Sequence, residues 1–170
     1  MKFSLCNEMF EGRPMAEVCS TARKLGYHGI EIAPFTLAPS ADEITAAQRK
    51  EARSAIEDNG LETVGLHWLF AGPTGLHMTT TDNQIRGRTR DYLSCLLDLC
   101  SDLGGKVLVL GSPKQRSIVD PQTKEKSKRS SNLVTCMPYA SKICSDSWPF
   151  RQLLKQALSY LVLSVAHNMV

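Results

Sequence analysis

Six side chains that could bind or react with a small ligand lie at the ends of four strand-like segments: Asn7, Glu31, His67, Trp68, Lys114 and Gln115. A carboxylate, an imidazole and an amide can hydrogen-bond to hydroxyl groups, and a lysine can pair with an anionic group. An exposed indole can cover the apolar face of a sugar. These residue types therefore predict a wall that binds a small, oxygen-rich substrate.

Each of these side chains also has a purely structural interpretation. Glu31 lies in an apolar strand whose residues face alternate ways, so its carboxylate either points into a polar mouth or pairs with a buried cation. A lone histidine such as His67 is more often a hydrogen-bonded structural residue than a ligand, and Trp68 can pack under the loop that follows it. A charged loop tip is the alternative for Lys114. The residues alone therefore assign no catalytic group and no metal ligand.

Strand-like and helix-like patterns alternate along the first two-thirds of the chain. Short strands are predicted at residues 2–6, 29–33, 61–67 and 106–111. Amphipathic helices are predicted between them, at about 14–25, 40–59 and 82–103. Strict alternation favours an α/β fold with a parallel sheet, which either an open doubly wound sheet or a closed barrel satisfies. The glycine fingerprint of a dinucleotide fold is missing after the first strand, which disfavours that option.

Capping residues mark where these helices should begin. Ser40 followed by Glu43 predicts a capping box at the start of the second helix. Asp82 can cap the third helix in the same way. Residues 106–111 are apolar on both faces, as a buried parallel strand requires.

The composition is that of an ordinary globular chain of 170 residues, with 42% hydrophobic and 22% charged residues. The net charge of +3 is too small to indicate a nucleic-acid partner. The six cysteines contain no C-x-x-C pair, and three fall on apolar helix faces, which predicts buried free thiols. Without a secretory signal or an apolar stretch long enough to span a bilayer, we expect no membrane and a cytoplasmic protein.

The pattern changes after Asp120, and the chain is divided there. Residues 1–120 carry the alternating elements. Residues 121–149 form an irregular segment rich in lysine and serine, with no apolar period. Residues 150–170 are apolar again, with the spacing of a C-terminal helix.

Four strings in the first segment resemble the xylose-isomerase-like TIM-barrel superfamily: GYHGIEIAP at 26–34, GLHW at 65–68, DLCSDLGG at 98–105 and GSPKQR at 111–116. They are similar in particular to proteins described as sugar phosphate isomerases or epimerases, whose relatives include hydroxypyruvate isomerases and ketose 3-epimerases. The likeness covers about residues 1–118, the N-terminal half of such a barrel. The ordered set of strings is specific, whereas each string alone is weak.

The resemblance implies a (β/α)8 barrel of about 250 residues, of which this chain would supply about four βα units and then a non-matching tail. In the family a divalent metal (Mn, Mg, Co or Zn) assists proton transfer next to a keto group. Its Glu, Asp, His and second Glu ligands are expected on later strands, and no such string is recognisable after Asp120. We therefore expect a sugar isomerase or epimerase that is truncated or frameshifted, binds no metal by itself and is of doubtful activity.

Other interpretations stay open beside this one. A half-barrel exposes two parallel edge strands, so the chain can be a non-catalytic half that associates with another chain, or a homo-oligomer joined through its sheet edges. An endonuclease-IV-like DNA repair enzyme is disfavoured, because residues 111–113 replace a histidine expected after the fourth strand. Under the leading interpretation the partner is a small sugar or keto-acid substrate, and whether this chain is an enzyme stays open.

Overall fold

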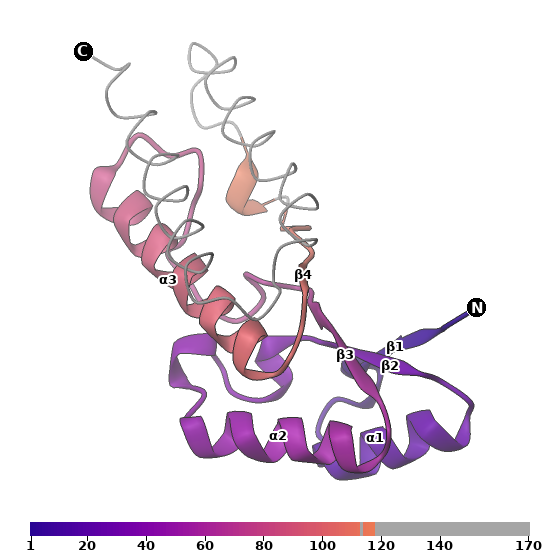
Figure 1. Cartoon of the computed structure of the whole chain (residues 1–170). Helices are drawn as coiled ribbons and strands as arrows, with labels where there is room; N and C mark the ends of the chain where they lie inside the picture. The colour runs from indigo at the N-terminus through magenta and orange to yellow at the C-terminus, as the bar shows by residue number, and fades with distance from the viewer. Residues whose placement is uncertain (113, 118–170) are drawn as a thin grey trace.

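The computed structural model of the chain describes residues 1–112 and 114–117. Within them, four strands form one parallel sheet in the order β1-β2-β3-β4 (Figure 1). The strands are β1 (Ser4–Cys6), β2 (Gly29–Ile32), β3 (Glu62–Leu66) and β4 (Val107–Leu108). A doubly wound sheet reverses its strand order at a switch point, whereas a barrel wall keeps chain order. The unreversed order therefore identifies an α/β fold with part of a (β/α)8 barrel.

Three α-helices follow the first three strands: α1 (Met15–Lys24), α2 (Ala46–Asp58) and α3 (Asn83–Asp102). Four short 3-10 turns complete the described elements: η1 (Asn7–Phe10), η2 (Pro34–Thr36), η3 (Ala41–Glu43) and η4 (Lys114–Arg116). Helices α1 and α2 lie next to each other along one side of the sheet, and α3 packs on α2 and β4 (Figure 1). This is the helical layer that a parallel sheet needs to bury its outer face.

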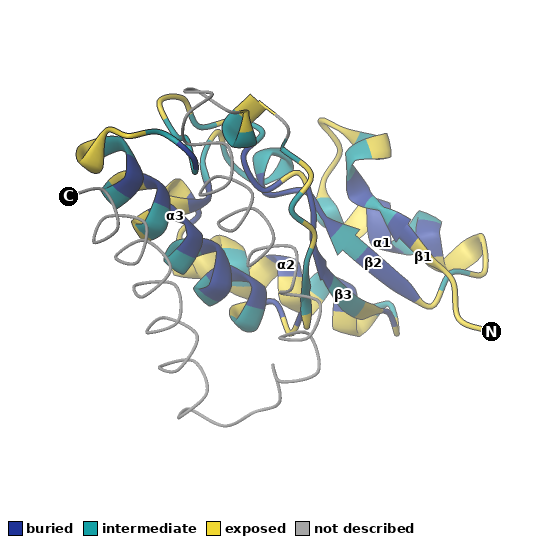
Figure 2. Ribbon diagram, turned by 90° about the horizontal axis from the view of Figure 1, so that it is seen from above, coloured by how far each residue is buried: buried dark blue, intermediate teal, exposed yellow. Residues whose placement is uncertain are grey.

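The core lies between the sheet and this helical layer. Figure 2 shows buried residues along the strands and exposed residues on the outer sides of the helices. The largest fully buried side chains come from strands, helices and the loop after β3: Ile30, Ile32, Ile56, Leu66, Leu69, Leu96, Leu99 and Leu103. Burying a side chain of this kind stabilises the fold by about 1.5–3 kcal/mol. The edge of the sheet at which β1, β2 and β3 end is therefore held on a rigid base.

The predicted start of the second helix was wrong. Ser40 bonds to the side chain of Asp42, and the backbone after it forms only the single turn η3. Ile44 then adopts an extended backbone conformation, which ends the turn. Helix α2 begins after Thr45, which shares a capping box with Gln48. The cap predicted at Asp82 is confirmed, because its carboxylate accepts the backbone N–H groups of the first turn of α3.

The fourth strand is shorter and less buried than predicted. Only Val107 and Leu108 are regular strand, both are half-buried, and Val109 is 47% exposed. Within the described residues β4 has a neighbour on one side only, so its second edge is not covered by another described strand. Its pairing with β3 is close, because a side-chain carbon on Gly65 would lie 1.9 Å from the Val107 carbonyl oxygen. Only glycine fits at that position.

None of the described cysteines, Cys6, Cys19, Cys95 and Cys100, forms a disulfide. As predicted, Cys19 and Cys100 are buried on helix faces, while Cys95 is half-buried. Among the described residues, no helix has the length and apolar character needed to cross a membrane. The predicted boundary at Asp120 and the segments 121–149 and 150–170 lie outside the described residues.

Candidate functional site

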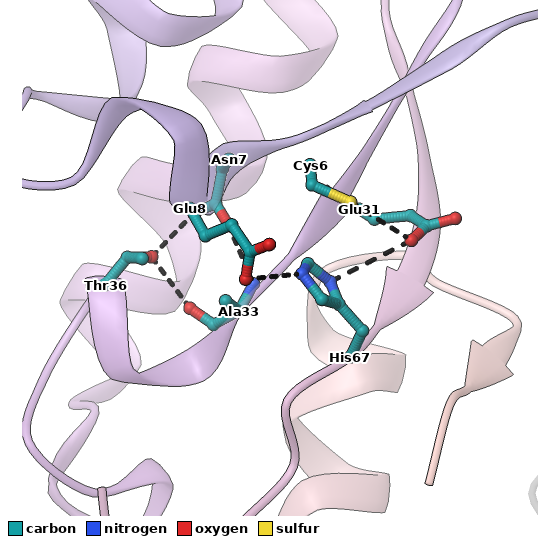
Figure 3. A network of polar contacts seen from close by, with 7 residues as sticks. All are labelled: Cys6, Asn7, Glu8, Glu31, Ala33, Thr36 and His67. Atoms are coloured by element: carbon teal, nitrogen blue, oxygen red, sulfur yellow. Dashed lines mark hydrogen bonds and ion pairs between the residues drawn. The ribbon is translucent and has the colours of Figure 1, made fainter. Parts of the chain in front are cut away.

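The ends of β1, β2 and β3 bring together a cluster of polar side chains, shown in Figure 3. We call Cys6, Glu8, Glu31 and His67 the strand-end cluster. Parallel strands end at the same edge of a sheet, so residues far apart in sequence meet there. Cys6 and Glu31 are direct partners in the β1–β2 register, which places both side chains on one face. The Cys6 Sγ lies 3.5 Å from the Glu31 Oε2.

A β-bulge helps to set the position of Glu31. Ile30 pairs with Thr63, whereas Glu31 pairs with Gly65, so β3 has one extra residue at this point. A bulge of this kind re-aims the side chains beside it and is frequent next to active sites. The Glu31 side chain is 30% exposed, so it is partly buried and keeps some contact with solvent. The sequence left two alternatives for Glu31, a carboxylate in a polar mouth or one paired with a buried cation. Among the described residues, no Lys or Arg pairs with it.

His67 lies between two carboxylates. Its backbone N–H donates to the Ile32 carbonyl at 3.0 Å, which extends the β2–β3 pairing by one residue and fixes the chain there. Its ring Nε2 lies 3.2 Å from the Glu8 Oε2, and its Nδ1 lies 3.9 Å from the Glu31 Oε2 (Figure 3). The residue is only 8% exposed. The Nδ1 has no hydrogen-bond partner among the described residues, although it is buried.

The Cys6 thiol is protonated at neutral pH in this arrangement. Partial burial raises the pKa of Cys6 to about 11, and the negative charges of Glu31 and Glu8 add to the effect. The thiol therefore donates to the Glu31 carboxylate. A thiol, a carboxylate and an imidazole nitrogen here lie within 4.8 Å of one another. They are groups that could hold a metal ion.

Asn7 acts as a clamp beside the strand-end cluster. Its Oδ1 accepts the Ala33 backbone N–H at 2.8 Å, and its Nδ2 donates to the Thr36 hydroxyl at 2.7 Å. The Thr36 hydroxyl in turn donates to the Ala33 carbonyl. The side chain is 3% exposed, so both amide groups are used by the protein itself. Asn7 thus ties the end of β1 to the end of β2, and its predicted role in binding substrate stays a prediction.

Trp68 follows His67 in an unusual backbone conformation. Its φ is 53°, which makes it the single non-glycine residue with positive φ in the described part of the chain. Its side chain is 55% exposed, so the strain is not explained by deep burial of the ring. Strain at an exposed aromatic residue next to a polar cluster is typical of a functional site. The predicted sugar-covering role is compatible with this position.

A sequence model of the family described as xylose isomerase-like TIM barrel matches residues 19–143, well over half of the 170-residue chain. The chain belongs to this family. No curated protein sequence matches the chain. The matched range includes Glu31, His67 and Trp68, and it runs past Asp120 into residues that the structure does not describe. Cys6, Asn7 and Glu8 lie before it.

Membership in this barrel family gives the strand-end cluster its significance. In such barrels the active site lies on the face where the strands end, because the loops after the strands meet there. The polar groups of β1, β2 and β3 lie on that face. The predicted residues Glu31 and His67 lie at this face, with Trp68 at the start of the following loop, and their role in binding substrate stays a prediction.

Lys114 and Gln115 are positioned by a different part of the chain. They form the turn η4, and the Gln115 carbonyl accepts the Met78 N–H at 2.8 Å. His77 also fixes the loop after β3, with its Nε2 3.1 Å from the Ser117 hydroxyl, and burial lowers its pKa. In the described ranges, no hydrogen bond or ion pair joins Lys114 or Gln115 to the strand-end cluster. Their role in binding substrate stays a prediction.

Cys6 and Glu8 are the cluster residues that sequence reasoning missed. Cys6 ends the first predicted strand and Glu8 follows it by two residues, so their position at a strand end could have indicated a place in the site. Their significance depends on the register between β1 and β2, which pattern alone does not fix.

A separate cavity of about 190 Å³ is lined by Asn7, Arg13, Thr36 and Gln48, among others, but by no residue of the strand-end cluster.

Proposed function

We propose that the protein is a cytoplasmic isomerase or epimerase of a small keto sugar or hydroxy-keto acid. The reaction would move a proton on the carbon next to a keto group. The observation that carries the proposal is the strand-end cluster, in which Glu8, Glu31 and His67 face one another on the active face of a barrel of this family. The four described cysteines form no disulfide with one another, which supports a reducing compartment.

The described residues would act as the wall that binds and orients the substrate. The Glu31 carboxylate can accept a hydrogen bond from a substrate hydroxyl, and the His67 ring can donate to or accept from a second one. Trp68 would cover the apolar face of the sugar, since its ring is exposed directly after His67. Asn7 would hold the ends of β1 and β2 so that these groups keep their spacing. We assign no proton-transfer step to a described residue.

The test is exchange of the substrate hydrogen next to the keto group in heavy water. Purified protein is incubated with a panel of ketoses and with hydroxypyruvate, and deuterium incorporation is followed by proton NMR. We expect exchange and epimerised or isomerised product with at least one member of the panel. Glu31→Gln and His67→Gln should slow exchange by about tenfold or more, because each removes an oriented hydrogen-bonding group.

Glu43→Gln is the matched control, because Glu43 is an exposed carboxylate in the turn η3, outside the strand-end cluster. It should leave exchange unchanged. Absence of exchange with the whole panel, together with no shift of the melting temperature by any member, would overturn the proposal. Such a result would favour the non-catalytic half-barrel.

A further inference from the structure

We propose that Cys6, Glu31 and His67 form a binding site for a divalent cation of the zinc class, with Glu8 orienting the histidine ring. The site is assembled from the described strand ends alone. It rests on these side chains and not on the proposed isomerase activity, so the two can fail separately.

The spacing of the three donor atoms fits a single ion after a small contraction. A tetrahedral zinc ion with sulfur, nitrogen and oxygen ligands places its donor atoms about 3.3 to 3.6 Å apart. The Cys6 Sγ is 3.5 Å from the Glu31 Oε2, and the His67 Nδ1 is 3.9 Å from the same oxygen. The three donors lie within 4.8 Å of one another, so movements of about 1 Å complete the geometry.

The orientation of His67 points its free nitrogen at this space. The contact between Nε2 and the Glu8 carboxylate fixes the proton on Nε2, because a carboxylate can only accept. The Nδ1 then carries a lone pair, is buried and has no hydrogen-bond partner among the described residues. A carboxylate behind a histidine ring, with the other nitrogen facing a metal, is the usual arrangement at metal sites.

An unshared lone pair facing the Glu31 carboxylate is unfavourable unless a positive charge lies between them. A cation removes that repulsion and satisfies both groups. The alternative is an imidazolium ion, in which a proton on Nδ1 replaces the cation and His67 pairs with Glu8 and Glu31 together. The two states differ in whether Cys6 takes part, since only a metal ion binds its sulfur.

The donor set selects the kind of ion. A thiolate and an imidazole favour Zn²⁺ or Co²⁺, whereas Mg²⁺ and Mn²⁺ favour oxygen ligands. Binding would release the thiol proton of Cys6 to solvent, because the metal ligand is the thiolate. Three protein ligands leave a fourth position open to water or to a substrate oxygen, as at catalytic zinc sites.

The experiment is titration of the metal-free full-length protein with Co²⁺, without any substrate. Binding should reach one equivalent and give a thiolate-to-Co²⁺ charge-transfer absorption in the near ultraviolet, and Zn²⁺ should displace it. Cys6→Ser should abolish this absorption, and His67→Gln and Glu31→Gln should each weaken binding by more than tenfold. Glu8→Gln should weaken binding by about tenfold, because it removes only the group that orients the ring.

Cys95→Ser and the double variant Cys136→Ser/Cys144→Ser are matched controls, and both should keep the absorption. Circular dichroism and a thermal melt of each variant show whether it is folded. If Cys6→Ser does not fold, protection of Cys6 from alkylation by one equivalent of Zn²⁺ in the unmodified chain replaces it. The proposal is overturned if no thiolate absorption forms, if it survives in folded Cys6→Ser, or if Zn²⁺ leaves Cys6 alkylation unchanged. An imidazolium signal for His67 by NMR that Zn²⁺ does not alter also overturns it.

Discussion

At the scale of single residues, hydrogen bonds within the protein fix the positions of the polar groups at the ends of the strands. The Asn7 side chain hydrogen-bonds to two groups that follow β2: its Oδ1 accepts the Ala33 backbone N–H, and its Nδ2 donates to the Thr36 hydroxyl. This fixes the end of β1, and with it Cys6, relative to Glu31. A site held on strands and supported by such a clamp is more rigid than one built on loops.

Trp68 offers a test of whether its strained backbone serves binding. A non-glycine residue in the left-handed region costs about 1–2 kcal/mol, and asparagine tolerates that region better than tryptophan does. We expect Trp68→Asn to leave the free energy of unfolding unchanged or to raise it by up to about 1 kcal/mol, because the ring is 55% exposed. Sugar binding, followed by calorimetric titration, should weaken. Urea denaturation that shows a clear loss of stability would instead mean that the ring packs structurally.

Cys19 predicts how stability depends on alkaline pH. Burial raises the pKa of Cys19 from 9.0 to about 11, so the folded chain keeps a proton that the unfolded chain loses. The stabilisation is complete below pH 9 and is lost as the pH rises from 9 through 11. The loss from this residue approaches about 2 kcal/mol of the free energy of unfolding at pH 11.

Urea unfolding at several values of pH between 8 and 10.5 measures this effect. Cys19→Ala removes the titrating thiol, so its stability should fall less steeply with pH, although its stability at pH 8 is lower because a buried side chain is shortened. Parallel slopes for the two proteins would contradict the buried, protonated state of Cys19. The comparison of slopes separates the proton effect from the packing effect.

At the scale of elements, the predicted strands and helices were largely confirmed because each has a local cause. The strands are short apolar runs that end at a glycine, a proline or a polar residue, and Asp82 caps α3 through its own neighbours. The predicted start of α2 was wrong because two possible N-caps, Ser40 and Thr45, lie five residues apart. Each is followed three residues later by a Glu or Gln that could complete a capping box. Local sequence could not choose between them. The buried packing of Ala41 and Ile44 did.

Some residues of the candidate site could likewise be predicted from local sequence, whereas others depend on long-range pairing. Glu31 and His67 could be predicted because each ends its own strand. Cys6 and Glu8 could not, because their roles depend on which residues pair between β1 and β2. Lys114 and Gln115 follow the fourth strand as expected, yet the loop after β3 holds them through Met78. The path of a long loop is not encoded in a periodic pattern.

Gly65 tests the close pairing of β3 with β4. A methyl group there would lie 1.9 Å from the Val107 carbonyl oxygen, which is backbone and cannot rotate away. We expect Gly65→Ala to lower the free energy of unfolding by about 3 kcal/mol, the upper range for overpacking. Gly87→Ala is the matched control, since nothing lies near its added methyl group in α3, and it should raise stability by about 1 kcal/mol. Urea denaturation of both variants gives the comparison, and equal effects would contradict the register.

At the scale of the whole molecule, the described sheet has two edges. Strands β1 and β4 each pair with one described neighbour, whereas a complete barrel has no edge at all. Among the described residues no strand pairs with the outer side of β1 or β4, and such an edge offers its N–H and C=O groups to another strand. We therefore propose that copies of this chain associate through a sheet edge, as an outcome that holds whether or not the protein is an enzyme.

Val109 lies where that association would occur. Its backbone N–H pairs with Leu66, which continues the edge beyond β4, while its side chain is 47% exposed.

We expect the unmodified chain to elute as dimers or larger species whose share grows with concentration, measured by size exclusion with light scattering. Val109→Lys should shift the chain toward monomer, because a charge on an edge strand must lose its hydration before another strand can pair there. Leu25→Lys adds the same charge to an exposed position directly after α1, outside the sheet, and should leave the distribution unchanged. If both lysine variants behave alike, net charge rather than the β4 edge governs association. A monomer at every concentration would overturn the proposed self-association of this chain.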